Sequence, residues 1–160
     1  MALGARYVHT NIVAQDWRRL ATFYIDVLGC EPVPPERHLK GEWLRRATGL
    51  DGVRIDGVHL RLPGSGAGGP TLELFEYGSP AGRLEAVPNR LGLGHLAFAV
   101  DDVAVALAEV LAAGGSAVGE VVTLPVPGAG YVTFVYARDP EGNIIELQQW
   151  RDGGAPSGAR

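Results

Sequence analysis

Two histidines and two glutamates occupy repeated places in this sequence and could bind a metal ion together. His9 and His95 each lie in an alternating apolar run, and Glu73 and Glu146 each lie in a later run of the same kind. A carboxylate is costly to bury among apolar residues unless it is paired, and a divalent cation would offset that cost. Imidazole and carboxylate ligands suit zinc, nickel, cobalt, manganese or iron(II) better than calcium or magnesium.

The elements that must position these residues are predicted from the spacing of apolar side chains. Alternation over residues 6–14 and 92–100 predicts two strands, with one of the two histidines in the middle of each. An amphipathic helix follows each strand, with Asp16 as one candidate N-cap and Asp101 or Asp102 as the other. Further strands are expected near residues 30–36, 53–63, 71–78, 116–119, 131–138 and 143–150, a short helix at 40–50, and a loop or broken edge at 121–130. The prolines of the 30–36 run allow only a short or edge strand there.

The order of one strand, one helix and three strands therefore occurs twice. This repeat predicts an α+β fold of two tandem β-α-β-β-β modules within a single domain of residues 1–160. Module one is expected over about residues 6–78 and module two over about 91–150. Residues 79–90 would connect the modules, and residues 151–160 would form a mobile tail because they offer little to bury.

Composition and charge limit the class of partner. The net charge of -4 and the pI near 5.5 argue against nucleic acid and against an anionic membrane, because both favour a basic surface. A small-molecule substrate is the better expectation. The single cysteine, Cys30, cannot form an internal disulfide, and no stretch resembles a signal peptide or a spanning helix. These features predict a cytoplasmic protein.

Five motifs carry a resemblance to a known family. They are YVHTNIV around His9, FYIDVLGCEP, LELFEYGSP around Glu73, GHLAFAVDDV around His95 and DPEGNIIEL around Glu146. Together they resemble the vicinal oxygen chelate superfamily, which includes glyoxalase I, methylmalonyl-coenzyme A epimerase, bleomycin- and fosfomycin-resistance proteins and extradiol dioxygenases. In that family, paired modules form an open, cupped mixed sheet around one metal. The resemblance implies that the two histidines and two glutamates are the ligands of a divalent transition metal.

The resemblance also implies an activity. A metal-dependent isomerase or epimerase would remove a proton next to the metal-polarised carbonyl of a small acid, thioester or ketone. Glu146 matches the glutamate that serves as ligand and base, and Glu73 is the second catalytic candidate. The alternatives are glyoxalase I (lactoylglutathione lyase), an extradiol-type dioxygenase, and a non-catalytic binding or resistance protein. A fourth protein ligand at Glu73 argues against the dioxygenase. The second base of the epimerase has no match, since only Asp51 and Asp56 are available.

Other polar residues are set aside because of their positions. His38 and His59 do not match the family's ligand positions and are expected at the surface or in a pocket wall. Glu76 has the opposite strand parity to Glu73 and is expected to face solvent. Arg45 and Arg46 are expected on a solvated helix face, with contact to an anionic substrate group as the alternative.

The resemblance implies a homodimer as well, because family members commonly cover exposed sheet edges and a helix face by pairing. Trp17, Trp43 and the proline-rich run at residues 32–35 are the segments expected near the partner.

Overall fold

A computed structural model describes residues 3–152 and divides the chain into two compact units, Met1–Arg83 and Leu84–Arg160. Each unit is described by itself. Their boundary lies within the segment 79–90. Among the described residues, no helix has the length and apolar character needed to cross a membrane.

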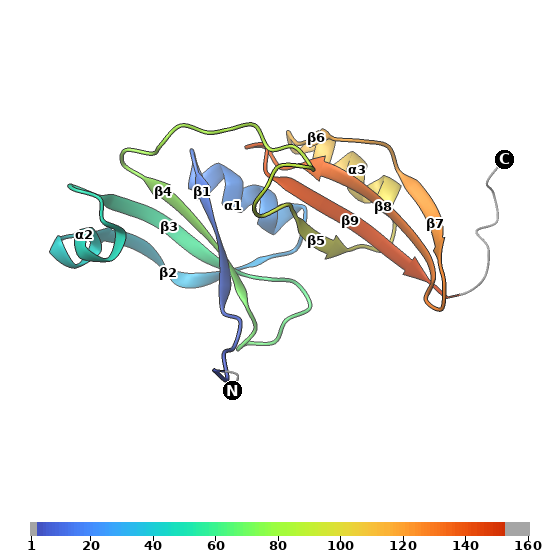
Figure 1. The fold of residues 1–160 in the computed structure, drawn as a ribbon, viewed down its shortest axis with the longest axis horizontal. Coiled ribbons are helices and arrows are strands. Elements are labelled where there is room, and N and C mark those ends of the chain that lie inside the picture. The colour runs from blue at the N-terminus through green and yellow to red at the C-terminus, as the bar shows by residue number, and fades with distance from the viewer. Residues whose placement is uncertain (1–2, 153–160) are drawn as a thin grey trace. The chain divides into compact units, whose positions relative to one another are not determined.

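Unit 1 contains a four-stranded mixed sheet and two helices (Figure 1). Its elements are β1 (His9–Ala14), α1 (Trp17–Asp26), β2 (Glu31–Lys40), α2 (Glu42–Thr48), β3 (Arg54–Arg61) and β4 (Thr71–Tyr77). The strand order is β1-β4-β3-β2, in which β1 runs parallel to β4 and the other neighbours are antiparallel. The strand that carries Glu73 is therefore in the middle of the sheet.

The helix α1 covers one face of this sheet. Its N-cap is Asp16, whose carboxylate accepts hydrogen bonds from the backbone N–H groups of the next turn at 3.1 Å, as the sequence predicts. Its buried side chains, such as Leu20, pack against β3 and β4, where Leu72 and Leu74 are almost completely buried. Because side chains alternate along a strand, Glu73 between these two leucines faces the opposite side of the sheet.

The short helix α2 covers part of that opposite side. Leu44 of α2 packs with Ile55 of β3 and Phe75 of β4 in a buried cluster. Gly49 ends the helix in the left-handed conformation with a φ of 74°, which a residue with a side chain rarely adopts. The insertion at residues 40–50 is thus helical, as expected, and packs two positions along β4 from Glu73.

Unit 2 repeats the arrangement of unit 1 (Figure 1). Its elements are β5 (Leu96–Ala99), α3 (Val103–Ala112), β6 (Ser116–Ala117), β7 (Val122–Val126), β8 (Gly130–Arg138) and β9 (Ile144–Arg151). The strand β5 runs parallel to β9, β9 is antiparallel to β8, and both β6 and β7 pair with β8. Asp102 is the N-cap of α3 and accepts backbone hydrogen bonds at 2.9 and 3.0 Å. The α+β class with a repeated module is therefore confirmed.

The edge strands differ from the prediction. Residues 121–130, predicted to be a loop or broken edge, contain the strand β7, which pairs with β8 along its whole length. A proline is tolerated there because one side of an edge strand needs no donors. β2 lies at an edge, as the prolines require of a long strand, and it extends to Lys40, beyond the predicted residues 30–36. Its pairing with β3 shifts register between Val33 and Arg37, which lets the proline-rich run remain in the sheet.

Two further expectations need correction. The strand β9 extends through Arg151, so the expected tail does not begin at residue 151, and residues 153–160 lie outside the described part of the chain. Trp17 is only 6% exposed and belongs to the core of unit 1, so it is not available to a partner. Trp43, on α2, is 56% exposed.

Candidate metal centre

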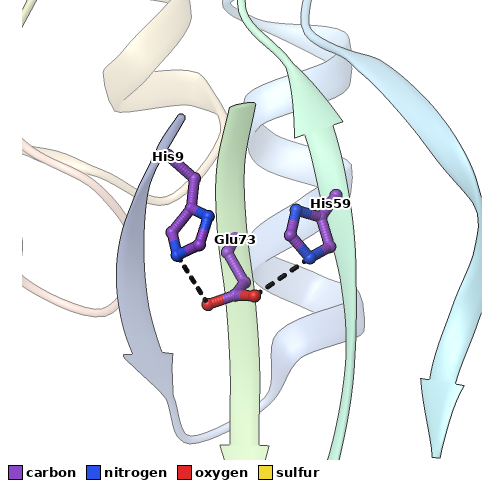
Figure 2. A group of neighbouring side chains, drawn as sticks. All are labelled: His9, His59 and Glu73. Atoms are coloured by element: carbon purple, nitrogen blue, oxygen red, sulfur yellow. Dashed lines mark ion pairs between the residues drawn. The ribbon is translucent and has the colours of Figure 1, made fainter. Parts of the chain in front are cut away.

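Three neighbouring strands of unit 1 bring His9, His59 and Glu73 together (Figure 2). His9 Nε2 lies 3.6 Å from Glu73 Oε2, and His59 Nε2 lies 2.9 Å from Glu73 Oε1, so the carboxylate stands between two imidazoles. The pairing of β3 with β4 places His59 directly opposite Glu73. His9 begins β1, two residues before Asn11, which is the partner of Glu73. His9 is therefore the first residue of its strand, whereas the sequence predicted a position in the middle of the strand.

Polar neighbours hold this cluster in place. Asn11 Nδ2 donates a hydrogen bond of 2.9 Å to Glu73 Oε2, and Thr71 Oγ1 lies 3.1 Å from His59 Nδ1. The Glu73 side chain is 13% exposed and that of His59 is 18% exposed, whereas His9 is 41% exposed. Burial lowers the pKa of the His59 imidazole below its usual value, although the nearby Glu73 carboxylate acts in the opposite direction. The neutral imidazole is the form that can bind a metal.

Unit 2 contains the second predicted histidine and glutamate as a pair of its own. His95 Nε2 lies 3.0 Å from Glu146 Oε2. Glu146 is on β9, and His95 directly precedes β5 instead of lying within it as predicted. Tyr136 of β8 is directly opposite Glu146, and its ring centroid is 5.0 Å from that of His95. Burial, the negative charge of Glu146 and a hydrogen bond to Glu146 raise the pKa of the Tyr136 hydroxyl, so it remains protonated at neutral pH.

Comparison with known proteins gives the family of the chain. The family model of the Glyoxalase/Bleomycin resistance protein/Dioxygenase superfamily matches residues 6–147. The chain belongs to this superfamily. The Escherichia coli K12 protein YaeR, itself uncharacterised, is 32% identical over 148 residues, which are 92% of this chain and 98% of YaeR.

Solved structures of the superfamily share the fold. A glyoxalase family protein from Bacillus cereus aligns with a TM-score of 0.70 at 24% identity, covering 94% of this chain and 95% of that one. Another from Enterococcus faecalis aligns with a TM-score of 0.60, also at 24% identity, covering 92% and 99% of the two chains.

Superfamily members commonly bind a divalent metal, and the donor set of unit 1 fits such an ion. One nitrogen each from His9 and His59 and one carboxylate oxygen from Glu73 lie within 4.8 Å of one another. Two imidazoles and a carboxylate are ligands that zinc and its neighbours in the first transition series accept. Unit 1 therefore contains a possible metal site at these three residues.

His59 is the residue of this cluster that sequence reasoning set aside. That His59 lies beside Glu73 on the same face of the sheet becomes known only from the register of β3 against β4. Residues 62–70 separate the two strands, and a connection of that length leaves several registers open. The signal present in the sequence was an additional histidine in a predicted neighbouring strand.

The two aspartates considered as a second base, and Arg45, interact with other residues of unit 1. Asp56 is on the other face of β3, where its carboxylate lies 2.6 Å from His38 Nδ1, and this hydrogen bond lowers the pKa of Asp56. Asp51 lies 3.6 Å from Arg45, whose guanidinium also binds Glu42 at 2.6 Å. The two aspartates considered as a second base thus have other partners, and Arg45 is already paired with acidic groups. Glu76, which was expected to face solvent, is on the opposite face of β4 from Glu73 and is half-buried.

Unit 1 also contains a cleft on the side of its sheet that carries Glu73. The cleft has a volume of about 720 Å³, and its lining includes Val13 of β1, Tyr77 of β4 and Leu50 after α2. Val13 and Tyr77 follow Asn11 and Glu73 by an even number of residues and therefore share their face. The cleft is of a size that suits a small organic molecule.

Proposed function

We propose that the protein is a metal-dependent isomerase or epimerase that acts next to the carbonyl of a small acid, thioester or ketone. The observation that carries this proposal is the repeated pair, His9 with Glu73 and His95 with Glu146, formed at matching strand positions in the two units. These four residues are proposed as metal ligands, with zinc, nickel, cobalt, manganese or iron(II) as the candidate ions. When bound, the metal would supply a Lewis acid that polarises the substrate carbonyl.

Glu146 is proposed as the base. A carboxylate can take the proton from the carbon next to the carbonyl and return it either to that carbon or to a neighbouring one. Return to a neighbouring carbon is isomerisation, whereas epimerisation also needs a second group that delivers a proton to the opposite face of the same carbon. Tyr136, which stays protonated and shares a hydrogen bond with Glu146, can hold the carboxylate without competing for the proton.

Glu73 is proposed as the more firmly held of the two glutamates. Its carboxylate contacts His9, His59 and Asn11, so a rotation would break several contacts at once. This restraint supports the role of a permanent ligand. The same restraint argues against an extradiol-type dioxygenase, in which a fourth protein ligand would take a position that oxygen chemistry needs.

The metal content of protein purified without chelators tests the ligand set. Wild type is expected to contain about one transition-metal ion per chain, and His9→Ala and His95→Ala should each remove most of it. His38→Ala, which changes a histidine on the other face of the sheet of unit 1, should leave it unchanged and serves as the control. Wild type that binds none of the five metals at micromolar levels would refute the proposal. Full metal retention in His95→Ala would restrict the ligands to unit 1.

A further inference from the structure

We infer that His59 is a positioning residue that engages one oxygen of Glu73 and leaves the other oxygen for the metal. This inference rests on the proposed function, because it assumes that Glu73 is a ligand, and it assigns His59 a supporting role in place of the ligand role that the cluster of unit 1 also allows. His59 Nε2 contacts Oε1 at 2.9 Å, whereas His9 Nε2 and Asn11 Nδ2 both approach Oε2. The two oxygens of the carboxylate are thus used by different neighbours, as Figure 2 shows for the two histidines.

The surroundings of His59 favour a ring that donates to Glu73. Thr71 Oγ1 lies 3.1 Å from Nδ1, and a hydroxyl that donates to Nδ1 places the ring proton on Nε2, facing Oε1. The rings of His9 and Phe75 meet that of His59 edge-on, with centroids 5.7 and 6.0 Å away. A ring held in this way can fix the rotamer of Glu73, and residues that orient a metal ligand raise the affinity of a site for its metal.

Unit 2 shows that these supporting residues are not a requirement of the fold. The strand pairings match Asn11 with Ala97, Thr71 with Ile144 and His59 with Tyr136. An alanine and an isoleucine cannot supply the amide and the hydroxyl that unit 1 uses. The amide and the hydroxyl that support Glu73 therefore have no counterpart beside Glu146, whose polar neighbour on the adjacent strand is Tyr136.

Metal affinity and the cobalt spectrum of the whole protein together test this role. In His59→Leu, the affinity for zinc and cobalt, measured by competition with a chelator, should fall by about 10- to 100-fold. In His59→Gln, whose side-chain amide can donate to Glu73, most of the affinity should return. At saturating cobalt, the visible absorption bands of both variants should match those of wild type, because the ligands are unchanged. His38→Gln is the matched control and should behave as wild type does.

Several outcomes would overturn the inference. Unchanged affinity in His59→Leu would show that Glu73 needs no support, and shifted cobalt bands at saturation would show that His59 is itself a ligand. If His59→Leu does not fold, Thr71→Val takes its place: a several-fold loss of affinity with unchanged bands supports the role, and an unchanged affinity contradicts it. Wild type that binds neither zinc nor cobalt would refute the proposed function as well, whereas normal binding in wild type together with an unaffected His59→Leu would refute only the role of His59.

Discussion

In each of the two units, one residue of the first strand pairs with the glutamate. A histidine lies two residues before that paired residue in both units. In unit 1, Asn11 pairs with Glu73 and His9 precedes it by two; in unit 2, Ala97 pairs with Glu146 and His95 precedes it by two. The helix that follows begins in both units at an aspartate N-cap. The repeat therefore preserves the histidine–glutamate pair together with the strand and the helix that position it.

The surroundings of the two glutamates differ. Glu73 contacts an amide and an imidazole, and the other nitrogen of that imidazole contacts a threonine hydroxyl. Glu146 has His95 and Tyr136, and the positions that match the amide and the hydroxyl carry alanine and isoleucine. A carboxylate with fewer restraints can move toward a substrate at lower cost. The difference supports a division of roles, with Glu73 as the fixed ligand and Glu146 as the base.

Exchanging the residues that pair with the two glutamates would test this division. Asn11→Ala gives Glu73 the same neighbour that Glu146 has, and it should weaken metal binding by about tenfold, because a hydrogen bond to a charged group contributes roughly 1.5–3 kcal/mol and part of it is replaced by water. The reverse change, Ala97→Asn, should leave metal affinity within about twofold while slowing turnover, since it adds a restraint to the proposed base. Equal effects of the two substitutions on metal affinity would contradict the asymmetry.

A smaller effect is expected on the opposite faces of the sheets. Unit 1 pairs His38 with Asp56 there, and unit 2 pairs Thr123 with Thr133 at the matching position. The hydrogen bond from His38 lowers the pKa of Asp56, so its stabilising contribution is present above the pKa of the unfolded state and is lost as pH falls through the lower folded pKa.

Asp56→Asn should therefore cost at most about 1 kcal/mol near pH 7, because the pair is partly exposed to solvent. The cost should shrink as pH is lowered toward the acid range, and urea unfolding of metal-free protein at several pH values measures it. Thr123→Val removes a neutral hydrogen bond in unit 2, and its cost should not depend on pH. A cost of Asp56→Asn that is the same at all pH values would show that the ionisation of Asp56 contributes nothing to stability.

Much of the fold could be predicted because its local signals agree. Apolar alternation, the aspartates at positions 16 and 102 and the repeated element order all indicate the same modules, and local agreement of this kind is typical of natural sequences. The edge strands were less predictable. In β2 and β7, proline competes with strand formation, and only pairing with β3 and β8 decides the outcome.

The candidate site was predicted less completely than the fold. The repeat and the family resemblance both indicate His9, Glu73, His95 and Glu146 as candidate ligands, and the structure brings them together as one pair in each unit. His59 could not be assigned to the cluster, since its place opposite Glu73 depends on a strand register that the sequence does not specify. The supporting role of residues such as Asn11 could not be predicted for the same reason, because they act through cross-strand contacts.

Proton exchange next to a carbonyl would show whether Glu146 acts as the base. Candidate 2-oxo acids, 2-hydroxy ketones and acyl thioesters are incubated in heavy water with metal-loaded protein, and deuterium entering the carbon next to the carbonyl is followed. Wild type should catalyse exchange on the right candidate, and metal-saturated Glu146→Gln should be slower by about 10²- to 10⁴-fold, the usual cost of removing a general base. Exchange by metal-saturated Glu146→Gln at the wild-type rate would exclude Glu146 as the base and would assign that role to another residue.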